Sequence, residues 1–394
     1  MKLTADVVVI GGGVIGTSAA YFLSKAGADV IVVEKEHVAA GASGHGPGFF
    51  NAFGGDFSRG DHLALGLESI RLIRENREHL EQFQEEPHWF NDRPSIAPAF
   101  SEDSRQHVRE MYDTNGSQLE AAGCGGTWFE AEDLIKEEPL LGSNVLGGYI
   151  FPSVIQIDGW KLSRLYMSAA KEMGARLVTG EVLGLDWDKN RASGVRLADG
   201  TQISSGSVVV AMGSWTPVAS VWLGFPLPIC NLKGQLHILR VPGGHDLKHH
   251  VIERIAVMQY PNGEYLLAAT PDPAPGGGLR PTDAYIRPLY ETNALPEDTD
   301  LLFETGLSMF PFLKGAEIVK DLAGGRPMSV DLLPMIGATP ALDNVFIAAG
   351  HGRKGIHLSA VTGKLTADLA LTGKTDLDLN IDAYSPMRFM PPKL

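Results

Sequence analysis

The first 35 residues alternate between apolar runs and one helix-like segment. Residues 6–10 form a short β-branched run of the kind that is buried on both faces of a parallel sheet. Residues 14–25 have a helix-forming composition that stops at Gly27, and residues 29–34 form a second apolar run. The pattern predicts a strand, a helix and a second strand in succession, which is the repeating unit of parallel sheets.

Helical periodicity recurs along the rest of the chain, separated by short apolar runs that glycine and proline bound. The helical pattern predicts helices over residues 61–83, 102–122, 131–138, 160–174, 298–310 and 358–371. The apolar runs predict strands over residues 147–158, 176–179, 181–186, 194–197, 201–203, 207–212, 231–241, 264–270, 316–322 and 344–349. Asp199 and Gly200, between two of these strands, predict a hairpin with a turn of the primed type.

Three glycines separate the first predicted strand from the first helix. Gly11, Gly13 and Gly16 have the spacing G-x-G-x-x-G in the strand–turn–helix context of a dinucleotide-binding motif. Glycines there allow a tight turn, a close approach to a diphosphate and close helix–strand packing. Glu34 ends the second strand 18 residues after Gly16, near the position of an acidic residue that binds a ribose hydroxyl. The segment predicts dinucleotide binding; the alternative is a glycine-rich turn in an ordinary βαβ unit.

Length, charge and cysteine content narrow the class of protein. The 394 residues exceed the size at which single cores stop growing, about 250–300 residues, so we expect two domains. A net charge of −14 argues against nucleic acid or an anionic membrane as a partner. Cys124 and Cys230 have no metal-binding spacing and fit a reducing compartment. No apolar run approaches the roughly 18 residues of a membrane span, and the early first strand leaves no room for a signal peptide. We therefore expect a cytoplasmic protein.

The strands that suit one parallel sheet lie at both ends of the chain and in its middle. This distribution predicts an α/β fold in which a discontinuous Rossmann-type dinucleotide-binding domain carries an inserted α+β substrate domain with a mixed sheet. We expect the dinucleotide-binding domain to comprise residues 1–84, 150–222 and 324–394, and the substrate domain to comprise residues 85–149 and 223–323.

A second glycine-rich turn, residues 350–355, precedes the last predicted helix. It carries Arg353 and Lys354, two cations at a helix start, where the helix dipole opposes positive charge. A bound anion would resolve that conflict; two solvated surface cations are the alternative. His351 in the same turn is a candidate for polarising a substrate or contacting a cofactor, with a structural role as the alternative.

Other polar residues are weaker candidates. His45 lies in the glycine-rich loop after Glu34, where packing or hydrogen bonding competes with a role as a base. Arg326 can pair with a carboxylate in fork geometry. His249 and His250 have no matching acidic spacing, so no metal site is predicted. The absence of a G-x-S-x-G motif gives hydrolysis no support.

Five segments together resemble the FAD-dependent amino-acid and amine oxidoreductases, the relatives of D-amino-acid oxidase, glycine oxidase and sarcosine oxidase. They are the opening Rossmann unit, the loop GASGHGPG, the strand and turn VVVAMGSW, the segment RPMSVDLLPMIG and the segment GHGRKGIHLSAVTGKLTADLALTGK. They occur in the family's order and span nearly the whole chain. The C-terminal segment is most similar to monomeric sarcosine oxidase, which has a similar GHG-x-K before a helix.

The resemblance implies a cofactor and a set of contacts. Residues 352–355 would direct N–H groups at the N1–C2=O edge of the flavin, where the reduced ring is anionic. Lys354 matches the family lysine that pairs with a substrate carboxylate, which would resolve the conflict at the helix start. The residues implied to contact FAD are Gly11, Gly13, Val14, Ile15, Gly16, Glu34, Lys35, Ser43, Gly44, His45, Val182, Gly213, Trp215, Gly350, Gly352, Arg353, Lys354, Gly355 and Ile356.

Two departures from sarcosine oxidase change what we expect. That enzyme carries its flavin on a cysteine in the segment where this chain has Arg326, and no cysteine follows Cys230. We therefore expect non-covalent FAD, with attachment through His45 as the alternative. The strand that bears the oxygen-activating lysine of sarcosine oxidase resembles residues 264–270, which contain none. The early loop offers no match for the carboxylate-binding arginine; Arg280 and Arg326 are the candidates.

These features predict a FAD-dependent enzyme that oxidises the C–N bond of a small amino acid or N-alkyl amino acid. Hydride would pass to flavin N5, and the imine would hydrolyse. Lys354, with Arg326 or Arg280, would anchor the carboxylate, and His351 and His45 would shape the surroundings of the flavin and substrate.

The electron acceptor and the assembly stay open. Oxygen is one acceptor; the alternative is a dehydrogenase that passes electrons to a non-oxygen acceptor. Two more hypotheses are a flavin-binding subunit of a hetero-oligomer with a partner subunit, and an NAD(P)-linked enzyme that uses the same Rossmann unit. Residues 274–281 (APGGGLRP) form a candidate lid.

Overall fold

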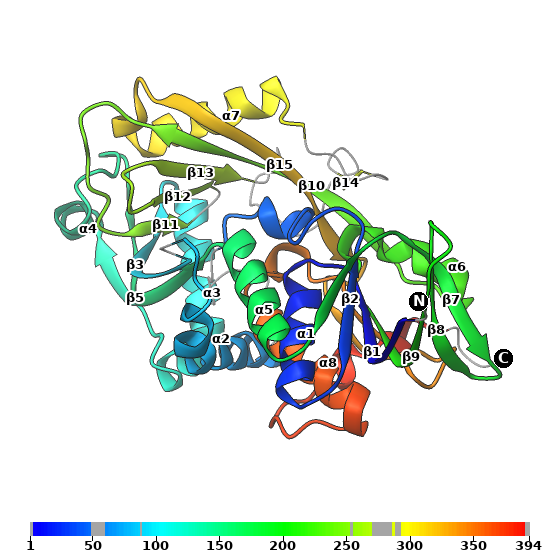
Figure 1. Ribbon diagram of the computed structural model, residues 1–394. Helices are drawn as coiled ribbons and strands as arrows, with labels where there is room; N and C mark the ends of the chain where they lie inside the picture. Colours follow the sequence, from blue (N-terminus) through cyan, green and yellow to red (C-terminus); the bar gives the residue numbers. More distant parts are fainter. Residues whose placement is uncertain are drawn as a thin grey trace.

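A computed structural model describes residues 3–48, 60–86, 89–252, 255–269, 286–287 and 293–390 of the chain. The described residues form two mixed sheets, here called sheet A and sheet B. Sheet A lies with helices α1, α5 and α8 at one end of the molecule, and sheet B lies at the other (Figure 1). The paired strands β10 and β15 run from sheet B toward sheet A.

Sheet A is built around the predicted opening strand. Its main path runs in the order β16 (Met335–Ala338), β17 (Val345–Ala349), β9 (Gln202–Val210), β1 (Leu3–Ile10), β2 (Val30–Glu34) and β6 (Arg176–Thr179). The pairs from β17 to β6 are parallel, whereas β16 is antiparallel to β17. Strands β7 (Val182–Asp188) and β8 (Arg191–Leu197) continue from β9 as antiparallel neighbours. This is the mixed, mainly parallel sheet of an α/β fold.

Alternate residues of β1 enter two different cores, because successive side chains of a strand point to opposite faces. Val7 and Val9 pack with helices α1 (Val14–Lys25), α5 (Gly159–Glu172) and α8 (Ser359–Thr372). Val8 and Ile10 pack on the other face, with β7, β8 and the short helix α6 (Ala219–Leu223). Both faces are covered, which explains why this strand reads as a continuous apolar run.

Sheet B carries the other described strands. They are β3 (Phe90–Ala99), β4 (Thr127–Glu130), β5 (Gly147–Ile157), β10 (Ile229–Arg240), β11 (His250–Ile252), β12 (Ile255–Gln259), β13 (Tyr265–Ala269), β14 (Ile286–Arg287) and β15 (Glu317–Ser329). Leu267 packs on one face with Leu302 of α7 (Pro296–Met309). Leu236, Leu266 and Ala268 form a small separate core on the other face with Met258. That second face supplies one wall of the candidate site.

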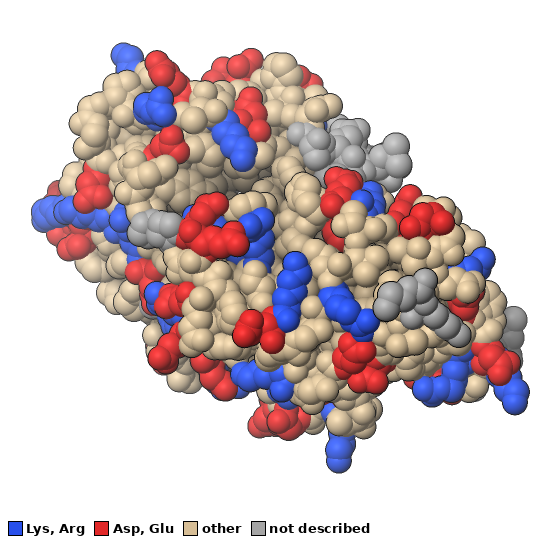
Figure 2. Space-filling model, in the orientation of Figure 1, with Lys and Arg blue, Asp and Glu red and all other residues tan. Residues whose placement is uncertain are grey.

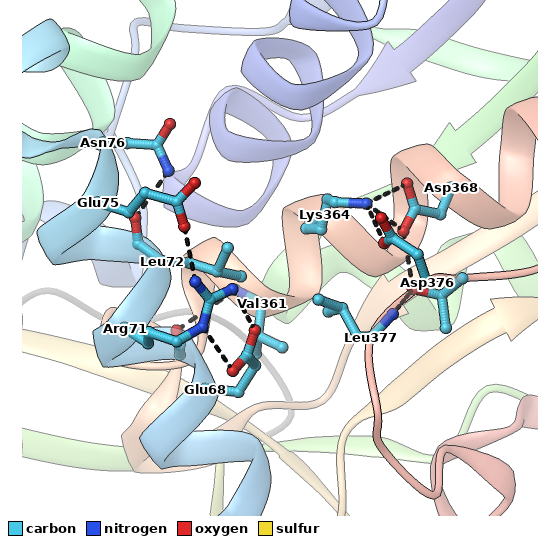
Figure 3. Close-up of polar contacts among 12 residues, drawn as sticks. Glu68, Arg71, Leu72, Glu75, Asn76, Val361, Lys364, Asp368, Asp376 and Leu377 are labelled. Carbon is cyan, nitrogen blue, oxygen red and sulfur yellow. Dashed lines mark hydrogen bonds and ion pairs between the residues drawn. The ribbon is translucent and has the colours of Figure 1, made fainter.

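Helix α2 (Gly60–Glu81) fixes the start of α8. The Ser69 hydroxyl donates to the carbonyl of His357 and accepts from the N–H of Val361 at 3.4 Å. Each helix also has ion pairs of its own: Arg71 of α2 pairs with Glu68 and Glu75, and Lys364 of α8 pairs with Asp368 and with Asp376, which follows the helix (Figure 3). A side chain from α2 therefore satisfies an N–H that the first turn of α8 leaves without a helical partner.

The predicted helices are confirmed, with ends that differ by a few residues; α3 (Glu102–Ala121) and α4 (Ala131–Glu137) complete the set. The primed turn is wrong. Gly200 has a φ of +87°, but Asp199 has no positive φ, and the N–H of Gly200 donates to Leu197 O at 3.0 Å. A tight turn followed by a left-handed glycine, as in a three-residue hairpin loop, therefore joins β8 to β9.

Two further differences concern the ends of elements. Arg353 and Lys354 lie on a 3₁₀ turn, η5 (Gly352–Lys354), and α8 begins only at Ser359, so the predicted cations are outside its first turn. Strand β15 is longer than the predicted strand over residues 316–322 and includes Arg326. The domain division stays a prediction; β5 and β15 cross its limits at residues 150 and 324, and both belong to sheet B.

Acidic and basic side chains are interspersed over the face of the molecule shown in Figure 2. Within the described ranges, no helix has the length and apolar character that a membrane crossing needs. The described residues also contain no group of three or more His, Cys, Asp and Glu side chains that could hold a metal ion. Cys124 and Cys230 are both free thiols.

Candidate functional site

The turn after β1, residues 11–16, is here called the cradle. Two of its glycines leave no space for a side chain. Gly11 has a φ of +111°, and a Cβ atom there would lie 2.9 Å from the carbonyl carbon of Ala211. A Cβ atom on Gly16 would lie 3.1 Å from the carbonyl carbon of Gly11 and would overlap its oxygen. Both obstacles are backbone atoms, which cannot swing away. The two positions therefore require glycine, as the motif predicts.

Two side chains already hold N–H groups of this turn. Glu34 Oε2 accepts from the N–H of Gly12 at 2.7 Å. Ser43 Oγ, in the 3₁₀ turn η1 (Ala42–Gly44), accepts from the N–H of Val14 at 2.9 Å. Residues 14–16 form the first turn of α1, where N–H groups have no partner within the helix and carry the positive end of its dipole. The turn can therefore bind an anion.

Four more of the predicted residues follow the ends of strands β2, β6 and β9. The ammonium of Lys35 lies 4.0 Å from the centre of the Trp215 ring. Trp215 belongs to the 3₁₀ helix η3 (Gly213–Val218), whose first residue, Gly213, has a φ of +51°. Val182 follows the β6–β7 turn, in which the N–H of Gly180 donates to Glu34 O at 2.8 Å. Gly213, Trp215, Lys35 and Val182 thus gather near the ends of β2 and β9.

The C-terminal glycine-rich turn packs against the end of β15. His351 forms a β-bridge with Met328, and the N–H of Ser329 donates to Gly350 O at 3.4 Å. Gly352 has a φ of +55°, and a Cβ atom there would lie 2.5 Å from Met328 Sδ. Lys354 is only 9% exposed, whereas Arg353 is exposed. The two predicted cations therefore differ in their exposure to solvent.

Two histidines near this turn are buried. His351 Nε2 hydrogen-bonds the Thr362 hydroxyl at 3.0 Å. Burial, and secondarily the nearby His62, lower the pKa of His351 to about 3. Burial, with the charge of Lys354 as a smaller cause, holds the pKa of His357 well below its ordinary value. Both imidazoles are therefore neutral at pH 7, which favours hydrogen bonding over charge pairing.

A pocket separates the η1 loop from the second face of sheet B. Arg326 of β15 reaches it from one side and His45 from the other, with His45 Nδ1 held 2.9 Å from Gly41 O. The described lining contains no Asp or Glu. It consists of Ala42, His45, Gly46, Pro47, Gly234, Gln235, Leu236, Ala268, Gly324, Gly325 and Arg326. The lining of the pocket therefore combines one guanidinium with an apolar wall.

The predicted catalytic residues fall into two neighbouring groups. His45 and Arg326 line one pocket. His351 and Lys354 lie on the turn beside β15, and Ile356 just after them reaches within 3.1 Å of the Cβ position of Gly46, which also lines the pocket. Arg280 and the predicted lid over residues 274–281 lie outside the described residues. The roles of all these residues stay predictions.

Sequence reasoning missed the wall of sheet B. Gly234, Leu236, Ala268 and Gly324 line the pocket, but they had no assigned role. Gly234 sits inside a strand-like stretch, and a glycine there often marks a close approach of another group. That signal was available in the sequence. The pairing of β10 with β15, which brings Gly234 opposite Gly324, was not.

The residues of the cradle fit FAD. A dinucleotide diphosphate needs close backbone approach at a helix start, which Gly11 and Gly16 allow. Glu34 stands at the end of β2, where an acidic residue can bind a ribose. The pocket between the η1 loop and sheet B lies next to this cradle, because Ser43 of η1 accepts from the N–H of Val14.

Comparisons with known proteins agree with this assignment. The chain is 26% identical over 373 residues to the glycine oxidase of Bacillus licheniformis, covering 94% of each chain. It is 27% identical over 397 residues to the bifunctional protein ThiO/ThiG of a Synechocystis strain, covering 99% of this chain but only 55% of that protein. The chain thus spans about half the length of this bifunctional relative.

Solved structures show the same fold. The crystal structure of glycine oxidase from Geobacillus kaustophilus superposes with a TM-score of 0.87, covering 99% of this chain and 100% of that chain at 24% identity. A family model described as FAD dependent oxidoreductase matches residues 6–369, which is most of the chain. The protein therefore belongs to the FAD dependent oxidoreductase family, as the resemblance predicts, and FAD is its cofactor.

Proposed function

We propose that this enzyme oxidises the C–N bond of a small amino acid or N-alkyl amino acid. The observation that carries the proposal is the pocket in which the Arg326 guanidinium and the His45 loop meet beside the FAD cradle. The similarity to glycine oxidases supports an amino-acid substrate.

Arg326 gives the pocket its selectivity for a carboxylate. A guanidinium presents N–H donors in a planar fork that matches the two oxygens of a carboxylate. Lys354, buried on the neighbouring turn, would add a second positive charge. Leu236 and Ala268 form an apolar wall, which suits a small side chain or N-alkyl group better than a charged one. These groups would fix the substrate at its carboxylate end.

The bound FAD would supply the oxidising chemistry by accepting a hydride at N5 from the carbon next to nitrogen, so that the product is an imine. Water would then hydrolyse the imine to a carbonyl compound and an amine. No carboxylate among the described lining residues can hold an ammonium ion. The pocket therefore favours the neutral amine, which has the lone pair that imine formation needs.

The pocket also bears on which electron acceptor the enzyme uses. Ala268, on the strand that resembles the lysine-bearing strand of sarcosine oxidase, gives the pocket no cation at this position. This observation favours a dehydrogenase that passes electrons to another acceptor as the second candidate. Arg326 stands where sarcosine oxidase has its flavin-bearing cysteine, so we propose that FAD is bound non-covalently.

An anaerobic absorbance titration tests the proposed function. The purified protein should be yellow and should lose its absorbance near 450 nm, the usual flavin band, as about two electrons are transferred from one amino-acid class. The panel comprises N-methyl, cyclic and D-amino acids, glycine, and the amides of those that react. Admission of air then distinguishes an oxidase, which regains its colour at once, from a dehydrogenase, which needs an added dye.

Three outcomes decide the proposal. Bleaching by an amino acid but not by its amide supports both the reaction and the carboxylate anchor. Equal bleaching by both members of a pair contradicts the anchor. A yellow protein that no amine bleaches contradicts the proposed reaction for this chain alone and favours a flavin-binding subunit that needs a partner.

A further inference from the structure

Gly234 and Arg326 face each other across two paired strands. In the antiparallel pair of β10 and β15, Leu232 lies opposite Arg326 and Gly234 lies opposite Gly324. Alternation along each strand places Gly234 and Arg326 on the same face of sheet B, the face that lines the pocket. The Arg326 side chain can therefore lie diagonally across Gly234.

The guanidinium occupies the space above Gly234. A Cβ atom on Gly234 would overlap the central carbon of the Arg326 guanidinium and would lie 2.6 Å from its Nη1. From this position Nη1 donates a hydrogen bond to Lys233 O at 3.4 Å. The missing side chain thus determines where the guanidinium can rest.

The backbone itself gives no reason for a glycine at this position. Gly234 is not among the residues with a positive φ, so any residue can adopt its conformation. A glycine inside a strand costs roughly 0.5–1 kcal/mol relative to alanine because it loses more chain entropy. The close approach of Arg326 is the structural feature that explains the residue.

We propose that Gly234 is a positioning residue for Arg326. Because Gly234 has no side chain, the guanidinium can lie flat against β10 and direct its N–H groups into the pocket. A methyl group there would lift the guanidinium and misalign it with a bound carboxylate. The inference rests on the proposed function, because Arg326 must be the group that binds the substrate carboxylate.

The obstacle to a methyl group is the end of a flexible side chain, not backbone. Gly234→Ala should therefore fold, with Arg326 displaced. Gly184 offers a matched control, because it lies in strand β7 opposite Arg196, and its Cβ position is an ordinary 3.5 Å from Arg196 Nη2. Gly184→Ala places the same methyl group beside an arginine without crowding it.

The experiment compares binding of acetate and acetamide to the FAD-loaded protein. Dissociation constants are measured from the change in flavin absorbance and by calorimetry. Gly234→Ala should weaken acetate binding at least tenfold and leave acetamide binding within twofold. Gly184→Ala should match the original protein for both ligands. FAD content and the melting temperature show that each variant is folded.

A double-mutant cycle separates positioning from general damage. Arg326→Lys removes the planar guanidinium that the methyl group would displace. In that background Gly234→Ala should change acetate binding by less than twofold. An equal loss with and without the guanidinium, or no loss in Gly234→Ala alone, would overturn the positioning role.

Failure of the proposed function would give a different result from failure of the positioning role alone. If the original protein binds acetate no better than acetamide, the pocket has no carboxylate site, and both proposals fall together. If the original protein prefers acetate and Gly234→Ala does the same with equal affinity, only the positioning role fails.

Discussion

Glu34 spans two backbone N–H groups with one carboxylate. Its Oε2 accepts from Gly12 at 2.7 Å, and its Oε1 accepts from Glu36 at 2.9 Å. The side chain therefore links the glycine-rich turn after β1 to the chain after β2. A single residue ties together the two segments that would hold the diphosphate and the adenosine ribose.

Replacing Glu34 by Gln should weaken FAD binding about tenfold. The amide is similar in shape, but its NH₂ group would face one of the two N–H groups as a second donor. The loss of a charged acceptor for one hydrogen bond corresponds to about 1.5–3 kcal/mol, and relaxation of the exposed end reduces it. Titration of the apoprotein with FAD, followed by flavin fluorescence, measures the change.

Glu36→Gln is the control for this substitution. Glu36 is exposed, and its side chain forms a 3.5 Å ion pair with Lys35. Its effect on FAD affinity should stay within twofold, because exposed ion pairs contribute little. Equal affinities of the Glu34→Gln variant and the original protein would show that Glu34 is not needed for the cradle.

The sequence predicted the glycine-rich turn after β1 better than the wall of the pocket. Gly11, Gly16 and Glu34 form a local motif, in which strand, turn and helix follow each other along the chain. Their spacing within that context specifies the geometry. The match of residues 6–369 to the family agrees with that interpretation.

The pocket wall could not be predicted in the same way. Gly234 and Arg326 lie 92 positions apart and meet only through the β10–β15 pairing. Strand β3 was missed, because Pro94 and Pro98 within it disfavour a strand by the usual rules. The approach of Gly234 to Arg326 and the formation of β3 both depend on the pairing of distant strands. A local sequence pattern does not reveal such pairing.

Replacing Lys354 by Met should raise KM about tenfold or more for the amino-acid substrate and leave KM for its amide within twofold. The ammonium is buried, so its attraction to a carboxylate is weakly screened. Steady-state kinetics with both substrates measure the difference. Lys364→Met is the control, because Lys364 forms its ion pairs with Asp368 on the same helix and with Asp376 in the segment after α8 (Figure 3). Equal losses for acid and amide would contradict an anchor role for Lys354.

Introducing a lysine at Ala268 should accelerate reoxidation of the reduced enzyme by oxygen at least tenfold. The first electron transferred to oxygen creates superoxide, and a nearby cation stabilises that developing negative charge. Ala268 lines the pocket, whereas its neighbour Ala269 packs with the core on the other face of sheet B. Ala269→Lys is therefore the control. Stopped-flow mixing of reduced protein with oxygenated buffer gives the rates, and equal rates for the two variants would contradict the electrostatic explanation.

His351 should make the stability of the protein depend on pH. Its pKa falls from an ordinary 6.5 to about 3 in the folded protein, because burial disfavours the charged imidazole. Between these values the unfolded chain binds more protons than the folded one. Stability therefore is fully present above about pH 6.5 and is lost as the pH falls, by up to about 1.4 kcal/mol per pH unit from this group.

His351→Gln should remove that contribution. The amide can still hydrogen-bond the Thr362 hydroxyl, but it does not titrate. Urea unfolding at pH 7.5, 6.5 and 5.5, with FAD held at one saturating concentration, gives the slope of unfolding free energy against pH. The slope of the variant should be smaller by about one proton at the lowest pH. An unchanged slope in His351→Gln would mean that this imidazole takes up no proton when the chain unfolds.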